Sequence, residues 1–259
     1  MTKPNEPILS VRELKTIRDS RVIHDGVNLD LYAGEVLVLL GESGSGKTLL
    51  LRTLVGLETP DAGTCLFEGR DLFKIAHNEW PKVRLKIAYA FQGGALFDSL
   101  TVRENLEFPL REHTRMTAKE RQNRVALQLD ELGLGRIEDL YPAELSGGMQ
   151  KRIGVARAII LDPQVILFDE PTAGLDPENV RRCNEMILRL KGLGKSAMVV
   201  THDPSCALVI ADRFAFLADG HVAVEQQRSA FEEGPDPNLR AYFSGADCNH
   251  RTHERGQHL

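Results

Sequence analysis

The chain has 259 residues, of which 42% are hydrophobic and 27% are charged, and its formal net charge is −5. This composition fits a folded protein with one large α/β domain or two small ones. The acidic balance gives no electrostatic basis for nucleic acid binding, which favours a basic domain. No apolar run approaches the roughly 18 residues of a membrane helix, and the start lacks a signal-peptide hydrophobic region. We therefore expect no nucleic acid partner, and we expect any attachment to a membrane to run through another protein.

A glycine-rich segment follows the apolar run 35–40, EVLVLL. Residues 41–48 read GESGSGKT and match the phosphate-binding pattern G-x-x-x-x-G-K-[ST] in a strand–loop–helix setting. Glycines let successive backbone N–H groups converge on phosphate oxygens, and a helix predicted over 48–57 points its positive end at them. A flexible glycine turn is the alternative reading of the pattern alone. The predicted phosphate-binding residues are Gly41, Glu42, Ser43, Gly44, Ser45, Gly46, Lys47, Thr48 and Leu49.

Two of these side chains have chemistry of their own. Lys47 can reach the β- and γ-phosphates as a point charge. The hydroxyl of Thr48 can ligate Mg²⁺, which prefers oxygen donors. We therefore predict a site for ATP and Mg²⁺.

The pattern turns helical between Gln92 and Ser146. Thr117 and Glu120 form a capping box, and apolar residues recur at helical spacing as far as Leu132. The following segment, 145–150, reads LSGGMQ, in which Ser146 is a good N-cap for a helix running to residue 160. Its two glycines would let an anion approach the helix start, although in isolation the segment is better explained as an ordinary helix start.

An apolar strand ending in two carboxylates follows, with residues 165–170 reading VILFDE. Asp169 at the tip of a buried strand is placed to hold Mg²⁺, usually through a coordinated water. Glu170 is placed to orient or deprotonate the attacking water. An ordinary strand end is the alternative.

Strand–helix alternation continues to the end of the core. We predict a helix over 177–191, a strand over 197–200 and a β-hairpin turning at Asp219-Gly220. Such alternation implies a parallel sheet with crossover helices.

The order of these motifs resembles the ATP-binding subunit of ABC transporters. The resemblance covers about residues 8–225, and it makes Gln92 the Q-loop glutamine, 173–176 (AGLD) the D-loop and His202 the switch histidine. It implies an α/β P-loop NTPase (ABC ATPase) with a RecA-like core, an antiparallel β subdomain and a helical signature subdomain. The nucleotide-binding domain would span 1–230, with 93–160 as the helical insertion, followed by an extension over 231–246 and a disordered tail over 247–259.

The resemblance also assigns roles to single residues. Glu170, His202 and Lys47 would be catalytic, and Thr48, Gln92 and Asp169 would hold Mg²⁺. The signature segment lies on a lobe remote from its own P-loop, so the family's head-to-tail pairing of two copies is expected, with each signature completing the partner's site. The nucleotide contacts expected across that dimer are Ser146, Gly147, Gly148, Gln150 and Asp176.

One expected feature of the family is missing. ABC ATPases commonly stack the adenine on an aromatic residue near the N-terminus, but residues 14–26 contain no Phe, Tyr or Trp. Ile17 is the expected occupant of that position. An aliphatic face lacks π-stacking, a loss of about 0.5–1.5 kcal/mol, so we predict weak base discrimination and competition by GTP.

Two further runs resemble the ATPase of Mla/Mce-type phospholipid transporters. They are 94–102 (GALFDSLTV) with 108–113 (FPLREH), and 234–245 (GPDPNLRAYFSG). This resemblance implies phospholipid transport between inner and outer membranes, from the cytoplasmic face of the inner membrane. The implied partners are an integral-membrane permease, an Mce lipid-binding subunit and a STAS-domain protein. We expect Phe97, Leu100 and Val102 to contact the permease, with core packing as the alternative.

Other readings remain open from the sequence. The same chemistry would serve an amino-acid or methionine importer, or a cell-division regulatory ABC complex. A DNA-repair head is disfavoured because no sustained heptad repeat lies between Gln92 and Leu145. The segment 234–245 can dock on a neighbour or on its own domain. The tail histidines His250, His253 and His258 fit a solvated tail better than a metal site.

Overall fold

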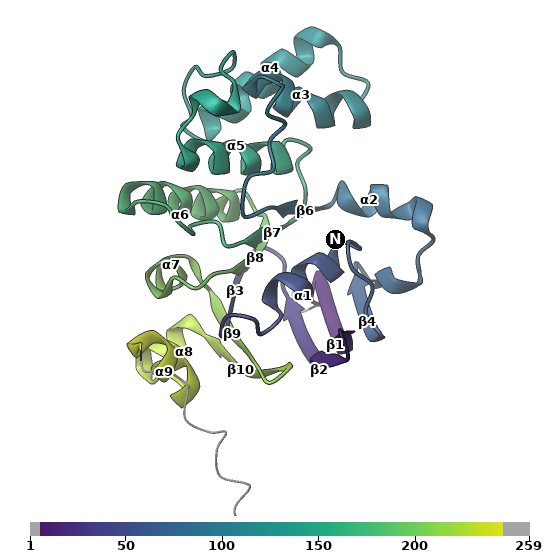
Figure 1. Ribbon diagram of the computed structural model, residues 1–259, viewed down its shortest axis with the longest axis vertical. Helices are drawn as coiled ribbons and strands as arrows, with labels where there is room; N and C mark the ends of the chain where they lie inside the picture. The colour runs from purple at the N-terminus through teal and green to yellow at the C-terminus, as the bar shows by residue number, and fades with distance from the viewer. Residues whose placement is uncertain (1–5, 246–259) are drawn as a thin grey trace, which may run out of the picture.

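The computed structural model describes residues 6–245. Its centre is a six-stranded sheet in the order β10-β9-β3-β8-β7-β6 (Figure 1). The strands from β9 to β6 run parallel, and β10 pairs antiparallel with β9 through the predicted Asp219-Gly220 turn. The bounds are β3 (Val36–Leu40), β6 (Ile87–Ala90), β7 (Val165–Asp169), β8 (Ser196–Val200), β9 (Arg213–Ala218) and β10 (His221–Gln227).

Both faces of this sheet are buried, which is why its strands read as continuous apolar runs. Alternate residues such as Leu37 and Leu39 face helix α1 (Lys47–Leu54), whereas Val36 and Val38 face the opposite layer. That layer contains α5 (Gly147–Ile159), α6 (Pro177–Gly192) and α7 (Pro204–Ile210). Helix α1 ends three residues earlier than predicted, because Gly56 turns the chain with a φ of 66°.

An antiparallel sheet covers the other side of α1. Its strand order is β2-β1-β4-β5. Leu9, Val11 and Leu14 of β1 pack in the same apolar core as α1. Asp25 in β2 also donates a backbone hydrogen bond of 2.7 Å to Gly220, which ties this sheet to the β9–β10 hairpin. The bounds are β1 (Leu9–Arg18), β2 (Arg21–Leu31), β4 (Ala62–Phe67), β5 (Arg70–Asp71), the short turns η1 (Leu72–Lys74) and η2 (His77–Glu79), and α2 (Trp80–Arg84).

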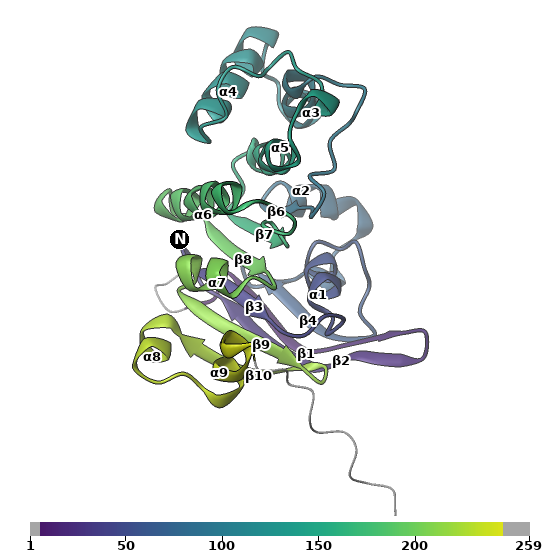
Figure 2. The same cartoon turned by 60° about the vertical axis from the view of Figure 1, so that its left-hand side comes forward.

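A helical lobe stands at one end of the molecule (Figures 1 and 2). It contains α3 (Val102–His113), α4 (Ala118–Glu131), η3 (Pro142–Glu144) and α5, which share a separate apolar core. The predicted capping box is present, since Thr117 accepts from the N–H of Glu120. Val102 is fully buried in this core, so the packing alternative describes it and the permease contact does not.

The C-terminal segment packs on its own domain. Helices α8 (Arg228–Glu233) and α9 (Pro237–Ser244) follow β10, and Leu239 is fully buried against the α6–α7 layer. Tyr242 and Phe243 pack onto the same core. Residues 247–259 with their three histidines lie outside the described residues. Within residues 6–245, no helix is long and apolar enough to cross a membrane.

Candidate functional site

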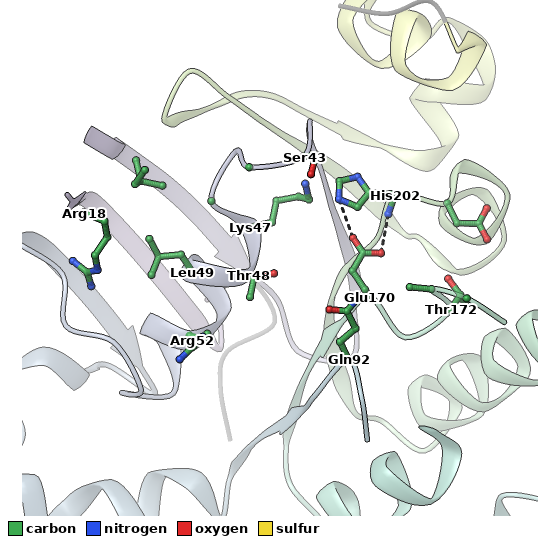
Figure 3. Close-up of a pocket in the computed structure, with 16 residues that line it drawn as sticks. Arg18, Ser43, Lys47, Thr48, Leu49, Arg52, Gln92, Glu170, Thr172 and His202 are labelled. Atoms are coloured by element: carbon green, nitrogen blue, oxygen red, sulfur yellow. Dashed lines mark hydrogen bonds and ion pairs between the residues drawn. The ribbon is translucent and has the colours of Figure 1, made fainter. Parts of the chain in front are cut away.

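A cavity of about 860 Å³ opens where three parallel strands end (Figure 3). The glycine-rich loop follows β3, Glu170 follows β7 and His202 comes shortly after β8. Ligand sites in α/β sheets form at this carboxyl edge because all parallel strands deliver their following loops there. Lys47, Thr48, Glu170, His202 and Gln92 all line the cavity, so the structure brings together residues predicted from segments far apart in the chain.

The glycine-rich loop has the backbone geometry that its sequence predicts. Gly41, Gly44 and Gly46 have φ angles of 152°, 82° and 99°, which residues with a Cβ rarely adopt. Lys47 Nζ donates hydrogen bonds of 2.8 Å to the carbonyls of Gly41 and Glu42, which hold the ammonium inside the loop. Burial lowers the pKa of Lys47 to about 8, against the attraction of nearby carboxylates. A phosphate entering this loop would stabilise the charged form further and raise the pKa again.

A buried histidine supports the loop from behind, and the sequence analysis missed it. His24 in β2 is fully buried, and its Nε2 lies 3.1 Å from the carbonyl oxygen of Gly46. A Cβ at Gly46 would lie only 2.6 Å from that nitrogen. Burial lowers the pKa of His24, so the neutral ring can donate to the carbonyl. No local motif marks this residue, because the contact depends on how β2 crosses the loop.

Oxygen-bearing side chains gather around Asp169, which lies behind the cavity wall next to Thr48. Thr48 Oγ1 donates a hydrogen bond of 2.8 Å to Asp169 Oδ1, and the hydroxyl of Tyr89 donates one of 2.7 Å to Asp169 Oδ2. Gln92 lines the same cavity from the loop after β6. A hydroxyl, a carboxylate and an amide oxygen fit Mg²⁺, which prefers hard oxygen ligands. Tyr89 was not predicted, since nothing near it in the sequence points to Asp169.

Glu170 and His202 form the second polar pair. The backbone N–H of His202 donates to Glu170 Oε2 at 3.1 Å, and His202 Nε2 lies 3.2 Å from Oε1 (Figure 3). Glu170 has a φ of 49°, a strained conformation that its N–H bond to Val200 helps to hold. Burial raises the pKa of Glu170, and burial together with Lys47 lowers that of His202. A carboxylate with a raised pKa beside a neutral imidazole suits general base chemistry.

The far end of the cavity is lined by Arg18, Ile23 and Arg52. Ile17 is 37% exposed and does not line the cavity, because neighbouring residues of a strand point to opposite faces. Arg18 Nη2 donates to Glu58 Oε2 at 3.1 Å and to the carbonyl of Thr59 at 3.0 Å. The guanidinium of Arg18 was not predicted, because the family pattern calls for an aromatic ring at this position.

The signature segment lies away from the cavity of its own chain. Ser146 caps α5 by accepting from the N–H of Met149 at 3.3 Å, as its sequence predicts. Asp176 caps α6, whereas Ala173 and Gly174 of the same D-loop line the cavity. The nucleotide contacts predicted across a dimer do not line the cavity of their own chain; they are Ser146, Gly147, Gly148, Gln150 and Asp176. The other predicted site residues that do not line it are Gly41, Glu42, Ser45, Ile17 and Asp169.

Comparison with known proteins identifies the family. The family described as ABC transporter matches residues 24–173, which is more than half of the chain and includes the glycine-rich loop, the signature and the two carboxylates. The chain belongs to the ABC transporter family, as an ATP-binding subunit. The resemblance drawn from the motifs is confirmed.

Among curated relatives of this ABC protein, two groups stand out. The intermembrane phospholipid transport system ATP-binding protein MlaF of Escherichia coli (strain K12) is 37% identical over 239 residues, covering 92% of this chain and 89% of the relative. The probable ribonucleotide transport ATP-binding protein mkl of Mycobacterium leprae (strain TN) is 38% identical over 232 residues, covering 89% of this chain and 67% of the relative.

Solved structures confirm the ABC fold. The dimeric post-hydrolysis state of the cassette MJ0796 bound to ADP and Pi has a TM-score of 0.79 at 31% identity, covering 85% of this chain and 98% of that one. The structure of cbiO1 from Clostridium perfringens has a TM-score of 0.81 at 26% identity, covering 92% and 95%. The predicted fold class is therefore confirmed.

Proposed function

We propose that this ABC subunit hydrolyses ATP in a head-to-tail dimer and thereby powers phospholipid transport between the inner and outer membranes. The observation that carries the ATPase part is the arrangement of Glu170 and His202 opposite Lys47 and Thr48 across one cavity (Figure 3). The similarity to proteins named MlaF over nearly the whole chain supports the phospholipid part.

The chain's own residues account for the hydrolysis step. The N–H groups of the glycine-rich loop and Lys47 hold the phosphates, which positions the γ-phosphorus. Glu170 accepts a proton from the attacking water while the water oxygen bonds to the γ-phosphorus and the bond to the β–γ bridging oxygen breaks. His202 holds Glu170 in place and lies where it can contact the γ-phosphate. Mg²⁺, held by Thr48, Asp169 and Gln92, would neutralise charge on the phosphates.

A second copy of the chain supplies the missing part of each site. Ser146, Gly147, Gly148 and Gln150 lie outside their own cavity, at the start of a helix whose positive end suits a phosphate. A two-fold dimer would place each signature over the partner's glycine-rich loop. The cassette MJ0796 is dimeric in its solved structure, which supports the pairing of two copies.

An apolar groove between the core and the helical lobe offers a seat for the permease. Its volume is about 480 Å³, and Leu57, Phe91 and Pro109 line it together with Arg157. This groove lies beside Phe97, whose ring packs on Phe108 and under the Arg157 guanidinium. An amphipathic permease helix would dock here with its apolar side inward.

The proposed assembly lies on the cytoplasmic face of the inner membrane and contains the permease, an Mce lipid-binding subunit and a STAS-domain protein. The test is to purify the complex from detergent-solubilised native membranes with this chain as bait, and to identify proteins and co-extracted lipids by mass spectrometry. A permease, an Mce protein and enriched phospholipid are the expected result. Recovery of a different permease without lipid enrichment would favour an importer or a division-regulator complex.

A further inference from the structure

Tyr89 lies between the groove and Asp169, the carboxylate beside the nucleotide cavity. It lies in β6 and is one of the residues that line the groove between the core and the helical lobe. Its hydroxyl donates a hydrogen bond of 2.7 Å to Oδ2 of Asp169, the carboxylate beside the nucleotide cavity. One residue therefore lines the groove and also binds the proposed metal-binding carboxylate with its hydroxyl.

At the groove end, Tyr89 packs against a neighbour that is open to a partner. The ring of Phe91 meets the Tyr89 ring edge to face, with centroids 4.5 Å apart and planes at 89°. Phe91 is 48% exposed and lines the same groove. A helix seated in the groove would press on Phe91, and close packing would pass that displacement to Tyr89.

At the carboxylate end, both oxygens of Asp169 are engaged. Thr48 Oγ1 donates to Oδ1 at 2.8 Å, and Tyr89 donates to Oδ2. Asp169 is only 5% exposed, so these two donors fix its orientation. Burial and the hydrogen bond to Asp169 raise the pKa of Tyr89, which keeps the phenol protonated as a donor. Hydrogen-bond partners behind a metal ligand commonly set its orientation and its affinity for the ion.

We propose that Tyr89 is a positioning residue whose hydroxyl fixes Asp169 for Mg²⁺ and whose ring makes that orientation depend on the permease segment in the groove. This inference rests on the proposed function, because it assigns Mg²⁺ to Asp169 and the permease to the groove. It is separate from the role of Gln92, which lines the nucleotide cavity from the loop beyond β6.

The hydroxyl is tested by Tyr89→Phe, which keeps the ring. Binding of a fluorescent non-hydrolysable ATP analogue is measured with a titration of Mg²⁺ and again in EDTA. We expect the Mg²⁺ requirement to rise about tenfold, since loss of such a partner typically weakens metal binding by that order. Binding in EDTA should not change. The matched control Tyr32→Phe removes a hydroxyl in the turn after β2, outside both cavities. An unchanged Mg²⁺ requirement in Tyr89→Phe overturns the proposal.

The groove connection is tested in the complex purified from native membranes. The quantity measured is the ratio of the ATPase rate of the complex to that of the isolated chain. It is compared for wild type, Tyr89→Phe and Phe91→Ala. Both variants should lower this ratio by about threefold, within the range seen for coupling residues. Phe91→Ala should keep the wild-type Mg²⁺ requirement, because the Tyr89–Asp169 bond remains. An unchanged ratio in both variants, with the permease still co-purifying in wild-type amount, overturns the connection to the groove.

Failure of the proposed function would look different. The wild-type chain would then show no Mg²⁺-dependent nucleotide binding, or the wild-type complex would show no ATPase activity. A wild-type complex that hydrolyses ATP beside a Tyr89→Phe variant with unaltered Mg²⁺ dependence leaves the ATPase function standing and rejects only the role of Tyr89.

Discussion

The nucleotide-facing edge of the parallel sheet and the start of helix α5 differ in how far apart in the chain their hydrogen-bond partners lie. At the sheet edge, residues far apart in the chain meet within hydrogen-bond distance: Thr48 and Asp169 at 2.8 Å, and His202 and Glu170 at 3.1 Å. At the start of α5, the hydrogen bonds of Ser146 stay within its own helix: its hydroxyl accepts from Met149 and its carbonyl from Gln150. The chain thus assembles one half of the proposed site internally and presents the other half outward, which is why the proposed site requires a second copy.

The two regions also have separate cores, yet the chain connects them tightly at one point. The helical lobe packs around its own apolar cluster, distinct from the two clusters that flank the sheet. The loop after β6 passes directly over α5, where a Cβ at Gly154 would lie 2.4 Å from the Cα of Gly94. Any movement of the lobe must therefore displace this loop, which contains Gln92.

The largest expected effect breaks the chemistry at the sheet edge. Glu170→Gln removes the general base but keeps its shape, so ATPase activity should fall by about 10³-fold while ATP binding persists. The variant should also accumulate as an ATP-bound dimer in size-exclusion chromatography. Glu178→Gln is the control, since Glu178 pairs with Arg182 on the outside of α6. Hydrolysis at the wild-type rate in Glu170→Gln would exclude this role.

The next largest effect is expected from a change in the signature segment at the start of α5 that leaves the fold intact. A Cβ at Gly147 meets no atom within 4 Å, so Gly147→Arg should fold normally but block the partner's site. We expect roughly a hundredfold loss of ATPase activity, comparable to losing transition-state donors, with unchanged thermal stability. Gly192→Arg, at an equally open position at the end of α6, is the control. Full activity of Gly147→Arg would contradict a site shared between copies.

The pH dependence sharpens the assignment of Glu170. Its pKa is raised by burial, and a general base works only when ionised. The hydrolysis rate should therefore rise with pH through the raised pKa, and fall about tenfold per pH unit below it. This acid limb should lie above the pKa of about 4.3 of an exposed glutamate. Measurement of kcat at saturating Mg²⁺-ATP over a range of pH checks this, and a limb at or below that value argues for another base.

A smaller effect concerns the base end of the cavity. Arg18 presents a planar guanidinium there, and such groups stack on aromatic rings with about 0.5–2 kcal/mol. Arg18→Ala should weaken ATP binding by about fivefold in equilibrium titrations, corresponding to this range. Ile17→Ala should change it less, since Ile17 lies outside the cavity. The reverse order would support the predicted role of Ile17.

The predicted competition by GTP belongs to the same experiment. Neither an aliphatic residue nor a guanidinium at this position selects between purines by its face alone. Titrations with GTP should therefore give an affinity within about a hundredfold of that for ATP. A larger preference for ATP would show that another residue reads the base.

The smallest effect is confined to stability. Thr117 caps α4 by accepting from the N–H of Glu120, and Thr117→Ala removes this bond. Denaturant unfolding should show a loss of about 1 kcal/mol, typical of a helix cap, with unchanged ATPase activity. Thr114→Ala at the opposite end of the α3–α4 connection is a useful comparison, because Thr114 bonds back to the Leu110 carbonyl. Loss of activity in Thr117→Ala would mean that the lobe is more closely coupled to catalysis than its separate core suggests.

Local chemistry explains what the sequence by itself determined. The glycine-rich loop, the strand that ends in Asp169 and Glu170, and the caps at Ser146 and Thr117 each depend on residues within a few positions of one another. Such patterns are visible in the sequence because backbone geometry and capping act over short range. The sheet followed from strand–helix alternation, since parallel strands need crossovers.

Only the tertiary structure decided the contacts between distant segments. Tyr89 and Asp169 are 80 positions apart, and His24 reaches Gly46 across 22. Arg18 lines the cavity and Ile17 does not, because of the face that β1 turns to the cavity. Helix α9 packs on an apolar layer formed by α6 and α7. Side-chain patterning indicates that a strand or helix has a buried face, but what lies against that face is set by long-range packing.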